Sequence, residues 1–436
     1  MVWLNVCVLL LVTAAVLVLL AGPSQHQQVV VCFSPFIFIP LTVIVGLFGN
    51  RDWVFWLIAF GTGALILIRL LAPPFSLPKP VGPYAIGTTT RQFINRELRD
   101  ALAPSGSDRW SEATVQFWYP ISQETRGVCT PYLAHGMRVA EGAARLLRNE
   151  RGQQFPIQFL SYSGIWFCRA HAIVDAEALT GTDPWPVVVV LTGFGGHRNM
   201  HTVQIEALAA QGYVVIGIDL PFICAHVQSA QDGSDCFVRP RAEVMDPIGT
   251  NAMISLVANQ SNWVIARALA LPTSDDAGVL ASLNLGKVGI YGVSLGAITA
   301  GLIAQTNPQI SAVAMADAEM HEAVADAGIG KPALWFTRTP DEMRTERNQS
   351  GGWSDEDIHA TTSTVEQAMA HQPEGLSTEV HIPGIFHAQF TDVPLWFGAL
   401  LRSHLEGPTP TRQAHQSINA HLLAFFSQWL STRESS

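Results

Sequence analysis

The stretch KVGIYGVSLGAITAG, residues 287–301, decides the fold class of this 436-residue chain. A β-branched apolar run enters Gly-Val-Ser-Leu-Gly, and a run of small residues with helical spacing leaves it. Glycines on both sides of a serine allow a sharp strand-to-helix turn that lifts the hydroxyl clear of the sheet. The stretch indicates a strand, a tight turn and a helix, with Ser294 as candidate nucleophile rather than an incidental turn serine.

Strand-like and helix-like runs alternate on both sides of this stretch. Apolar strands are expected within 185–196, 213–220, 287–294, 310–317, 331–339 and 377–384, and the clearest helices at 201–212, 251–271 and 416–430. Two earlier strands, TTTRQFIN and EATVQFWYP, are expected to pair as a hairpin before the main sheet. Uninterrupted apolar strands between helices predict the α/β class, with a doubly wound, mostly parallel sheet.

The N-terminal region has a different character, because the first 50 residues contain no Lys, Arg, Asp or Glu. Three apolar segments of about 20 residues each are long enough to cross the hydrocarbon core of a bilayer. We therefore expect a membrane region over 1–72, a Pro-rich linker over 73–81 and a catalytic domain over 82–436. The transmembrane helices are expected at 3–21, 29–49 and 53–71.

The orientation of these helices depends on few charges. Arg51 lies between the second and third segments, whereas the first loop has no Lys or Arg. The positive-inside rule then puts the second loop in the cytoplasm and the catalytic domain outside it, although Arg69 and Lys79 favour the reverse. A cleaved signal peptide is the alternative, but the first residues lack its basic segment.

The net charge of the chain bears on its partners, and its cysteines bear on whether it forms disulfides. The formal net charge of −10 argues against nucleic acid as a partner. Four cysteines lie outside the apolar segments, namely Cys129, Cys168, Cys224 and Cys236. We expect buried free thiols, with two disulfides as the alternative in an oxidising compartment.

A serine nucleophile needs a base and an acid that orients the base. His387 follows the Pro383-Gly384 turn and is free to project over the sheet, whereas His381 lies within a strand-like alternation. Two aspartates follow neighbouring strands, Asp317 and Asp341. The pattern predicts His387 as the base and leaves both aspartates open as the acid.

The oxyanion of an acyl-transfer intermediate needs two aimed N–H donors. Leu295 follows the nucleophile, and Phe194 lies in the glycine-rich loop TGFGGHRN, so their backbone N–H groups are the candidates. His197 and His201 are four residues apart but have no third ligand at a fitting spacing. We expect no metal and no organic cofactor.

The chain resembles the platelet-activating-factor acetylhydrolase family, the lipoprotein-associated type of phospholipase A2, from about residue 82 to 430. The resemblance rests on GPYAIGTTT, VQFWYP, TGFGGHRN, YGVSLGA, DAEM, HAQFTD and LLAFFSQWL. It implies an α/β-hydrolase fold with Ser294, Asp317 and His387 as catalytic residues and Phe194 and Leu295 as oxyanion donors. Val293 departs from the family pattern, and the segment 339–379 is longer and more polar than expected.

The function expected from these residues is that of a membrane-anchored serine ester hydrolase. The resemblance implies phospholipids or related lipids with short or modified acyl chains as substrates. One alternative is a carboxylesterase like cutinase or dienelactone hydrolase, acting on small esters or polyesters with Asp341 as acid. Another is a catalytically silent, membrane-bound binding protein with the same fold. The pattern predicts no oligomeric state.

Overall fold

A computed structural model describes residues 75–151, 165, 168–180, 183–245, 248–397 and 402–430, without the side chains of 147–151. The expected transmembrane segments at 3–21, 29–49 and 53–71 lie outside the described residues. Within those ranges, no helix combines the length and apolar character needed to cross a membrane.

The described residues form one sheet of ten strands, in the order β12-β11-β10-β9-β5-β6-β2-β1-β4-β3. The strands of this sheet are β1 (Ala85–Arg99), β2 (Trp110–Ile121), β3 (Cys129–Pro131), β4 (Arg169–Val174), β5 (Trp185–Leu191), β6 (Val214–Asp219), β9 (Leu285–Val293), β10 (Ile310–Ala316), β11 (Ala333–Thr337) and β12 (Ser377–His381). β7 (His226–Gln228) and β8 (Asp235–Phe237) pair separately as a small antiparallel ribbon.

The sheet is parallel from β6 to β12, which confirms the mostly parallel sheet expected from the sequence. β1 and β2 pair antiparallel over Ala85 to Arg99, as the two early strand-like runs predict, and β2 continues antiparallel onto β6. Because neighbouring parallel strands end at one edge, residues that follow β9, β10 and β11 come together there.

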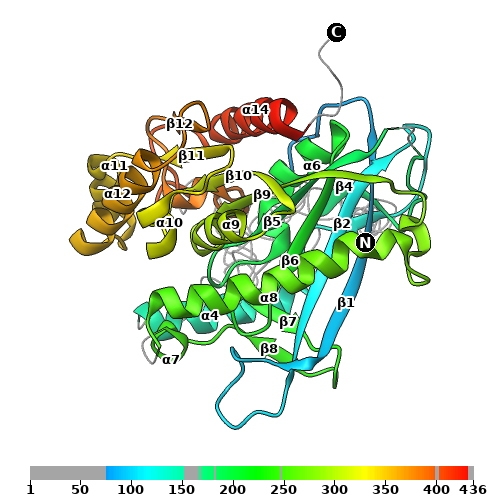
Figure 1. The fold of residues 1–436 in the computed structure, drawn as a ribbon, viewed down its shortest axis with the longest axis horizontal. Coiled ribbons are helices and arrows are strands. Elements are labelled where there is room, and N and C mark those ends of the chain that lie inside the picture. Colours follow the sequence, from blue (N-terminus) through cyan, green and yellow to red (C-terminus); the bar gives the residue numbers. More distant parts are fainter. Residues whose placement is uncertain are drawn as a thin grey trace, which may run out of the picture.

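Helices cover both faces of this sheet (Figure 1). α8 (Thr250–Ala270) and α9 (Leu295–Thr306) pack on one face, and α6 (Thr202–Ala210) and α14 (Thr411–Leu430) on the other. Each face buries its own apolar cluster, with Ile254 and Leu302 in one and Ile205 and Leu422 in the other. This two-sided burial explains why the central strands are apolar at almost every position.

The remaining helices lie at the periphery. They are α4 (Gly136–Arg151), α7 (Arg241–Val244), α10 (Glu322–Ala327), α11 (Pro340–Ser350) and α12 (Asp355–Ala370), with the short 3-10 helices η2 (Arg198–His201), η3 (Leu271–Thr273), η4 (Gly278–Leu280), η5 (His387–Phe390) and η6 (Val393–Trp396). Figure 1 shows α11 and α12 beside β11 and β12, at the end of the molecule away from β1. This pair of helices accounts for most of the long polar segment noted in the sequence.

The four cysteines of the described region are all free. Cys168, Cys224 and Cys236 are buried, whereas Cys129 is partly exposed. The free-thiol expectation is therefore confirmed, although one of the four thiols is not buried.

Candidate active site

Ser294 occupies a strained turn between β9 and α9. Its backbone has φ 57° and ψ −128°, a conformation that non-glycine residues rarely adopt. Its N–H donates to the carbonyl of Ala316 on the neighbouring strand at 3.0 Å, which ties the turn to the end of β10. A Cβ on Gly292 would lie 2.0 Å from the Gly296 carbonyl oxygen, so the flanking glycines are needed for this close packing.

The glycine-rich loop after β5 lies against Ser294. A Cβ added to Gly193 would lie 3.1 Å from Ser294 Cβ and 3.5 Å from its Oγ. Gly195 N–H donates to the Ile223 carbonyl at 2.8 Å and Gly196 N–H to the Gly193 carbonyl at 3.0 Å. Among the described residues Phe194 N–H has no acceptor, so it is free to donate to a bound group.

Leu295 is the first residue of α9. The first N–H groups of a helix have no acceptor within the helix, and the helix dipole favours negative charge at this end. The Leu295 N–H therefore combines an available donor with a favourable potential beside Ser294. That Phe194 and Leu295 are the oxyanion donors stays a prediction.

Asp317 and His387 form a hydrogen-bonded pair at the same edge of the sheet. His387 Nδ1 donates to Asp317 Oδ2 over 2.6 Å. Asp317 directly follows β10 with φ 52°, and its N–H donates to the Phe336 carbonyl at 3.1 Å. This second strained backbone aims the carboxylate across the end of β11 toward η5, which His387 begins.

The charge of Asp317 is maintained although its side chain has no exposed surface. Burial alone would raise its pKa, but the Arg338 guanidinium and the His387 hydrogen bond outweigh burial and hold the pKa at about 2. An ionised acceptor requires the proton on His387 Nδ1, which leaves Nε2 as a proton acceptor. The His387 side chain is 31% exposed, so part of its ring faces outward.

The candidate nucleophile Ser294 and the candidate base His387 are not hydrogen-bonded to each other in the described residues. Within the described part of the chain no hydrogen bond links Ser294 Oγ to His387. Such contacts are often long in a site without substrate and tighten in the complex. What the structure brings together is the Ser294 turn, the strand end that carries Asp317, and the Asp317–His387 pair.

The other candidate acid and histidine lie elsewhere. Asp341 is on the first turn of α11, where its carboxylate pairs with Arg344 at 2.8 Å and is 92% exposed. His381 ends β12, as expected of a strand residue, and its Nε2 lies 2.8 Å from Glu342. Of the two aspartates left open by the sequence, only Asp317 contacts His387.

His197 and His201 are both buried. His197 Nε2 lies 3.1 Å from Asp219, and burial lowers the pKa of His197 to about 3 and that of His201 to about 4. The described residues contain no group of three His, Cys, Asp or Glu side chains suited to a metal ion. His197 instead caps η2 by accepting from the Asn199 N–H, which fixes the exit of the glycine-rich loop.

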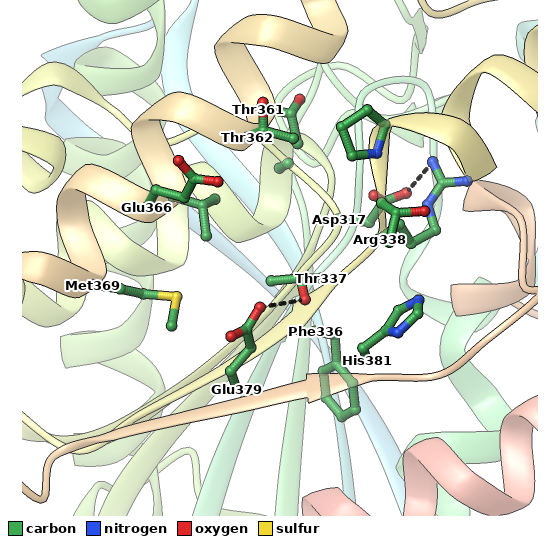
Figure 2. Close-up of a pocket in the computed structure, with 14 residues that line it drawn as sticks. Asp317, Phe336, Thr337, Arg338, Thr361, Thr362, Glu366, Met369, Glu379 and His381 are labelled. Atoms are coloured by element: carbon green, nitrogen blue, oxygen red, sulfur yellow. Dashed lines mark hydrogen bonds and ion pairs between the residues drawn. The ribbon is translucent and has the colours of Figure 1, made fainter.

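Arg338 is a residue of this site that the sequence reasoning missed. It follows β11, is buried, and forms an ion pair with Asp317 at 2.8 Å, drawn as a dashed line in Figure 2. An arginine after the apolar run ALWFT, at an edge where charged side chains collect, was the available signal.

A cavity of about 470 Å³ borders Asp317 and Arg338. It lies between α12 and the strands β11 and β12, and its lining includes Thr337, Glu366 and Glu379 (Figure 2). Ser294 and His387 are not among the described residues that line it. The cavity therefore adjoins the acid of the pair rather than the candidate nucleophile.

Comparison with known proteins identifies the fold. Residues 186–364 match the family model described as alpha/beta hydrolase fold. A solved structure of a ferulic acid esterase from Streptomyces cinnamoneus is similar to this chain, with a TM-score of 0.60 and 22% sequence identity; the similarity covers 83% of this chain and 95% of that one. No curated protein matches the chain. The chain has the α/β-hydrolase fold, which confirms the expected architecture of the described residues.

Proposed function

We propose that this chain is a serine hydrolase of carboxylic esters that works through an acyl-enzyme. The proposal is carried by one observation: a strained Ser294 turn shares an edge of the sheet with a 2.6 Å Asp317–His387 pair. A serine on such a turn, a histidine and a buried carboxylate are the parts that activate a hydroxyl for acyl transfer.

In the proposed mechanism His387 Nε2 takes the proton of Ser294 as Oγ attacks the ester carbonyl. The N–H groups of Phe194 and Leu295 stabilise the oxyanion, and Asp317 stabilises the imidazolium. The alcohol leaves with the proton that His387 returns to it. A water molecule, deprotonated by the same His387, then attacks the acyl-enzyme, and His387 returns that proton to Ser294 Oγ as the carboxylic acid leaves.

The finer proposal concerns the ester. The sequence resemblance to platelet-activating-factor acetylhydrolases supports lipids with short or modified acyl chains as substrates. One structurally similar protein is a ferulic acid esterase, so an aromatic acyl ester is a second substrate class to test. Small esters and polyesters remain the alternative for an esterase of the cutinase or dienelactone-hydrolase type.

We also propose that segments 3–21, 29–49 and 53–71 anchor the catalytic domain, residues 82–436, to a membrane, with that domain outside the cytoplasm. The absence of charge from the first 50 residues supports the anchoring. A membrane-impermeant protease added to sealed cells or spheroplasts should digest the domain. Complete protection until lysis would reverse the orientation, and recovery of the chain in the soluble fraction would refute the anchoring.

The test of activity uses the purified full-length chain in mild detergent and a panel of esters. The panel contains p-nitrophenyl acetate and butyrate, a 2-acetyl phospholipid, a long-chain phospholipid and methyl ferulate. Hydrolysis that disappears in Ser294→Ala is expected for at least one short-chain ester. No hydrolysis of any ester, or equal rates in Ser294→Ala, would refute the proposal and favour a silent binding protein.

A further inference from the structure

Arg338 connects the Asp317–His387 pair to a second buried carboxylate. Its Nη2 lies 2.8 Å from Asp317 Oδ2, the oxygen that also accepts from His387. Its Nη1 donates to Glu346 Oε2 at 2.6 Å, and the Arg338 side chain has no exposed surface. One guanidinium therefore bridges two carboxylates directly behind the candidate base.

Glu346 lies beside Arg338 because α11 starts directly after Arg338. Thr339, the residue after Arg338, starts the helix with a capping box that it forms with Glu342. The helix thus starts at the end of β11, and two turns later Glu346 points back to Arg338. Its Oε2 also accepts from the backbone N–H of His387 at 3.2 Å. Glu346 consequently holds the main chain of His387 while Asp317 holds its ring.

Trp353 closes the same cluster from the turn after α11. Its Nε1 donates to Glu346 Oε2 at 3.0 Å, and its ring meets the His387 ring edge-on with centroids 5.4 Å apart. Gly351, Gly352 and Trp353 all have positive φ, at 80°, 78° and 53°. The two glycines adopt this conformation freely, but Trp353 is held in it by its surroundings, as is typical of residues with a constrained role.

The net charge of the cluster formed by Asp317, Arg338, Glu346 and His387 depends on whether His387 is protonated. With a neutral imidazole, Asp317, Glu346 and Arg338 sum to −1, and with an imidazolium the sum including His387 is zero. The other groups packed around His387 in these contacts are uncharged, namely the Trp353 indole and backbone amides. Removing the charge of Glu346 disfavours the imidazolium, whereas removing that of Arg338 favours it.

We propose that Arg338, Glu346 and Trp353 are positioning residues that hold His387 and Asp317 in the geometry for proton transfer. This inference rests on the proposed function, because it assigns His387 the role of base. The inference also assigns a role to the long polar segment 339–379, because α11 places Glu346, and the residues after α11 place Trp353, beside His387.

The test compares Glu346→Gln and Arg338→Met by the pH dependence of kcat/KM. The acid side of the profile, where His387 gains a proton, should move to lower pH in Glu346→Gln and to higher pH in Arg338→Met. Each shift is expected to be about one pH unit or more for charges this close in a buried site. Arg344→Gln is the matched control, because it removes an exposed arginine from the same helix. Its profile should be unchanged.

Two further variants separate positioning from folding. Glu346→Ala removes the acceptor of the His387 N–H and should lower kcat on the order of 10²-fold with little change in KM. Trp353→Phe keeps a ring beside His387 and should retain most of the activity that Trp353→Ala loses. Melting temperatures identify any variant that fails to fold. If Arg338→Met does not fold, Arg338→Gln takes its place with the same expected shift, whereas Arg338→Lys, which keeps the charge, should leave the profile close to wild type.

An NMR titration of the His387 ring reports on the same groups without any substrate. A wild-type protein that hydrolyses none of the esters would count against the proposed function. The positioning cluster would still be supported if the midpoint of the His387 NMR titration moved in opposite directions in Glu346→Gln and Arg338→Met. Profiles and titrations unchanged in both folded variants, or moved in the same direction, would overturn the inference.

Discussion

Asp317→Asn is the substitution that most directly probes the candidate active site. The asparagine has the size of the aspartate, but its neutral side chain no longer requires the proton on His387 Nδ1. The Asp317 carboxylate is fully buried and 2.6 Å from that nitrogen, so no solvent charge replaces it. Loss of an acid in this position lowers kcat by about 10⁴-fold, equivalent to about 5 kcal/mol of transition-state stabilisation.

The matched variant is Asp341→Asn, which changes an exposed carboxylate after the next strand. It should leave kcat within about twofold, since exposed ion pairs contribute little. The assay is steady-state hydrolysis of the best short-chain ester, with melting temperatures to verify folding. A collapse of kcat in Asp341→Asn, or an Asp317→Asn enzyme within tenfold of wild type, would refute the assignment of Asp317 as the acid.

The same two variants should also differ in how their free energy of unfolding depends on pH in the acid range. The folded-state pKa of Asp317 is lowered from 3.8 to about 2, so its stabilisation is present above about pH 4 and is lost as the pH falls toward 2. A lowering of this size corresponds to about 2 kcal/mol. The free energy of unfolding of Asp317→Asn should therefore fall less steeply with acid than that of wild type or Asp341→Asn.

Three further substitutions test other parts of the structure. Gly193→Ala should lower kcat/KM by about tenfold or more without changing the melting temperature, because the new Cβ lies 3.1 Å from Ser294 Cβ; an unaffected rate would contradict the loop's contact with the nucleophile. Gly296→Ala should instead cost about 1–3 kcal/mol in chemical denaturation, because its Cβ would lie 2.2 Å from the Leu191 carbonyl oxygen. Burial raises the pKa of Asp392 well above its ordinary value, so wild-type stability is lost as pH rises from that ordinary value through the folded-state pKa; Asp392→Asn should lose less stability over the same rise in pH, and a parallel loss in both proteins would be inconsistent with this titration.

Local sequence patterns predicted most of the architecture because each strand carries its own signal. β5, β6, β9 and β10 are apolar at nearly every position since both of their faces are covered, and such runs are recognisable one at a time. The Ser294 turn is equally local, because its glycines and the small residues of α9 are neighbours in the chain. The choice of His387 over His381 likewise depended on the adjacent Pro383-Gly384 turn.

The acid was a different problem. Asp317 and Asp341 each follow a strand, and nothing in their neighbouring residues reveals that one carboxylate turns inward and the other faces solvent. The difference arises from the positive φ of Asp317 and from contacts with residues 21 and 70 positions away, Arg338 and His387. A family resemblance pointed to Asp317, but spacing alone did not.

The sequence by itself determined the sheet, the strand-to-helix turn of Ser294 and the set of groups able to do acid–base chemistry, because these follow from patterns a few residues long. The tertiary structure decided which of those groups meet. It paired His387 with Asp317, and it brought Arg338, Glu346 and Trp353 behind them from a segment that looked only long and polar. Charge interactions depend on distance and burial, and both are set when the chain has folded.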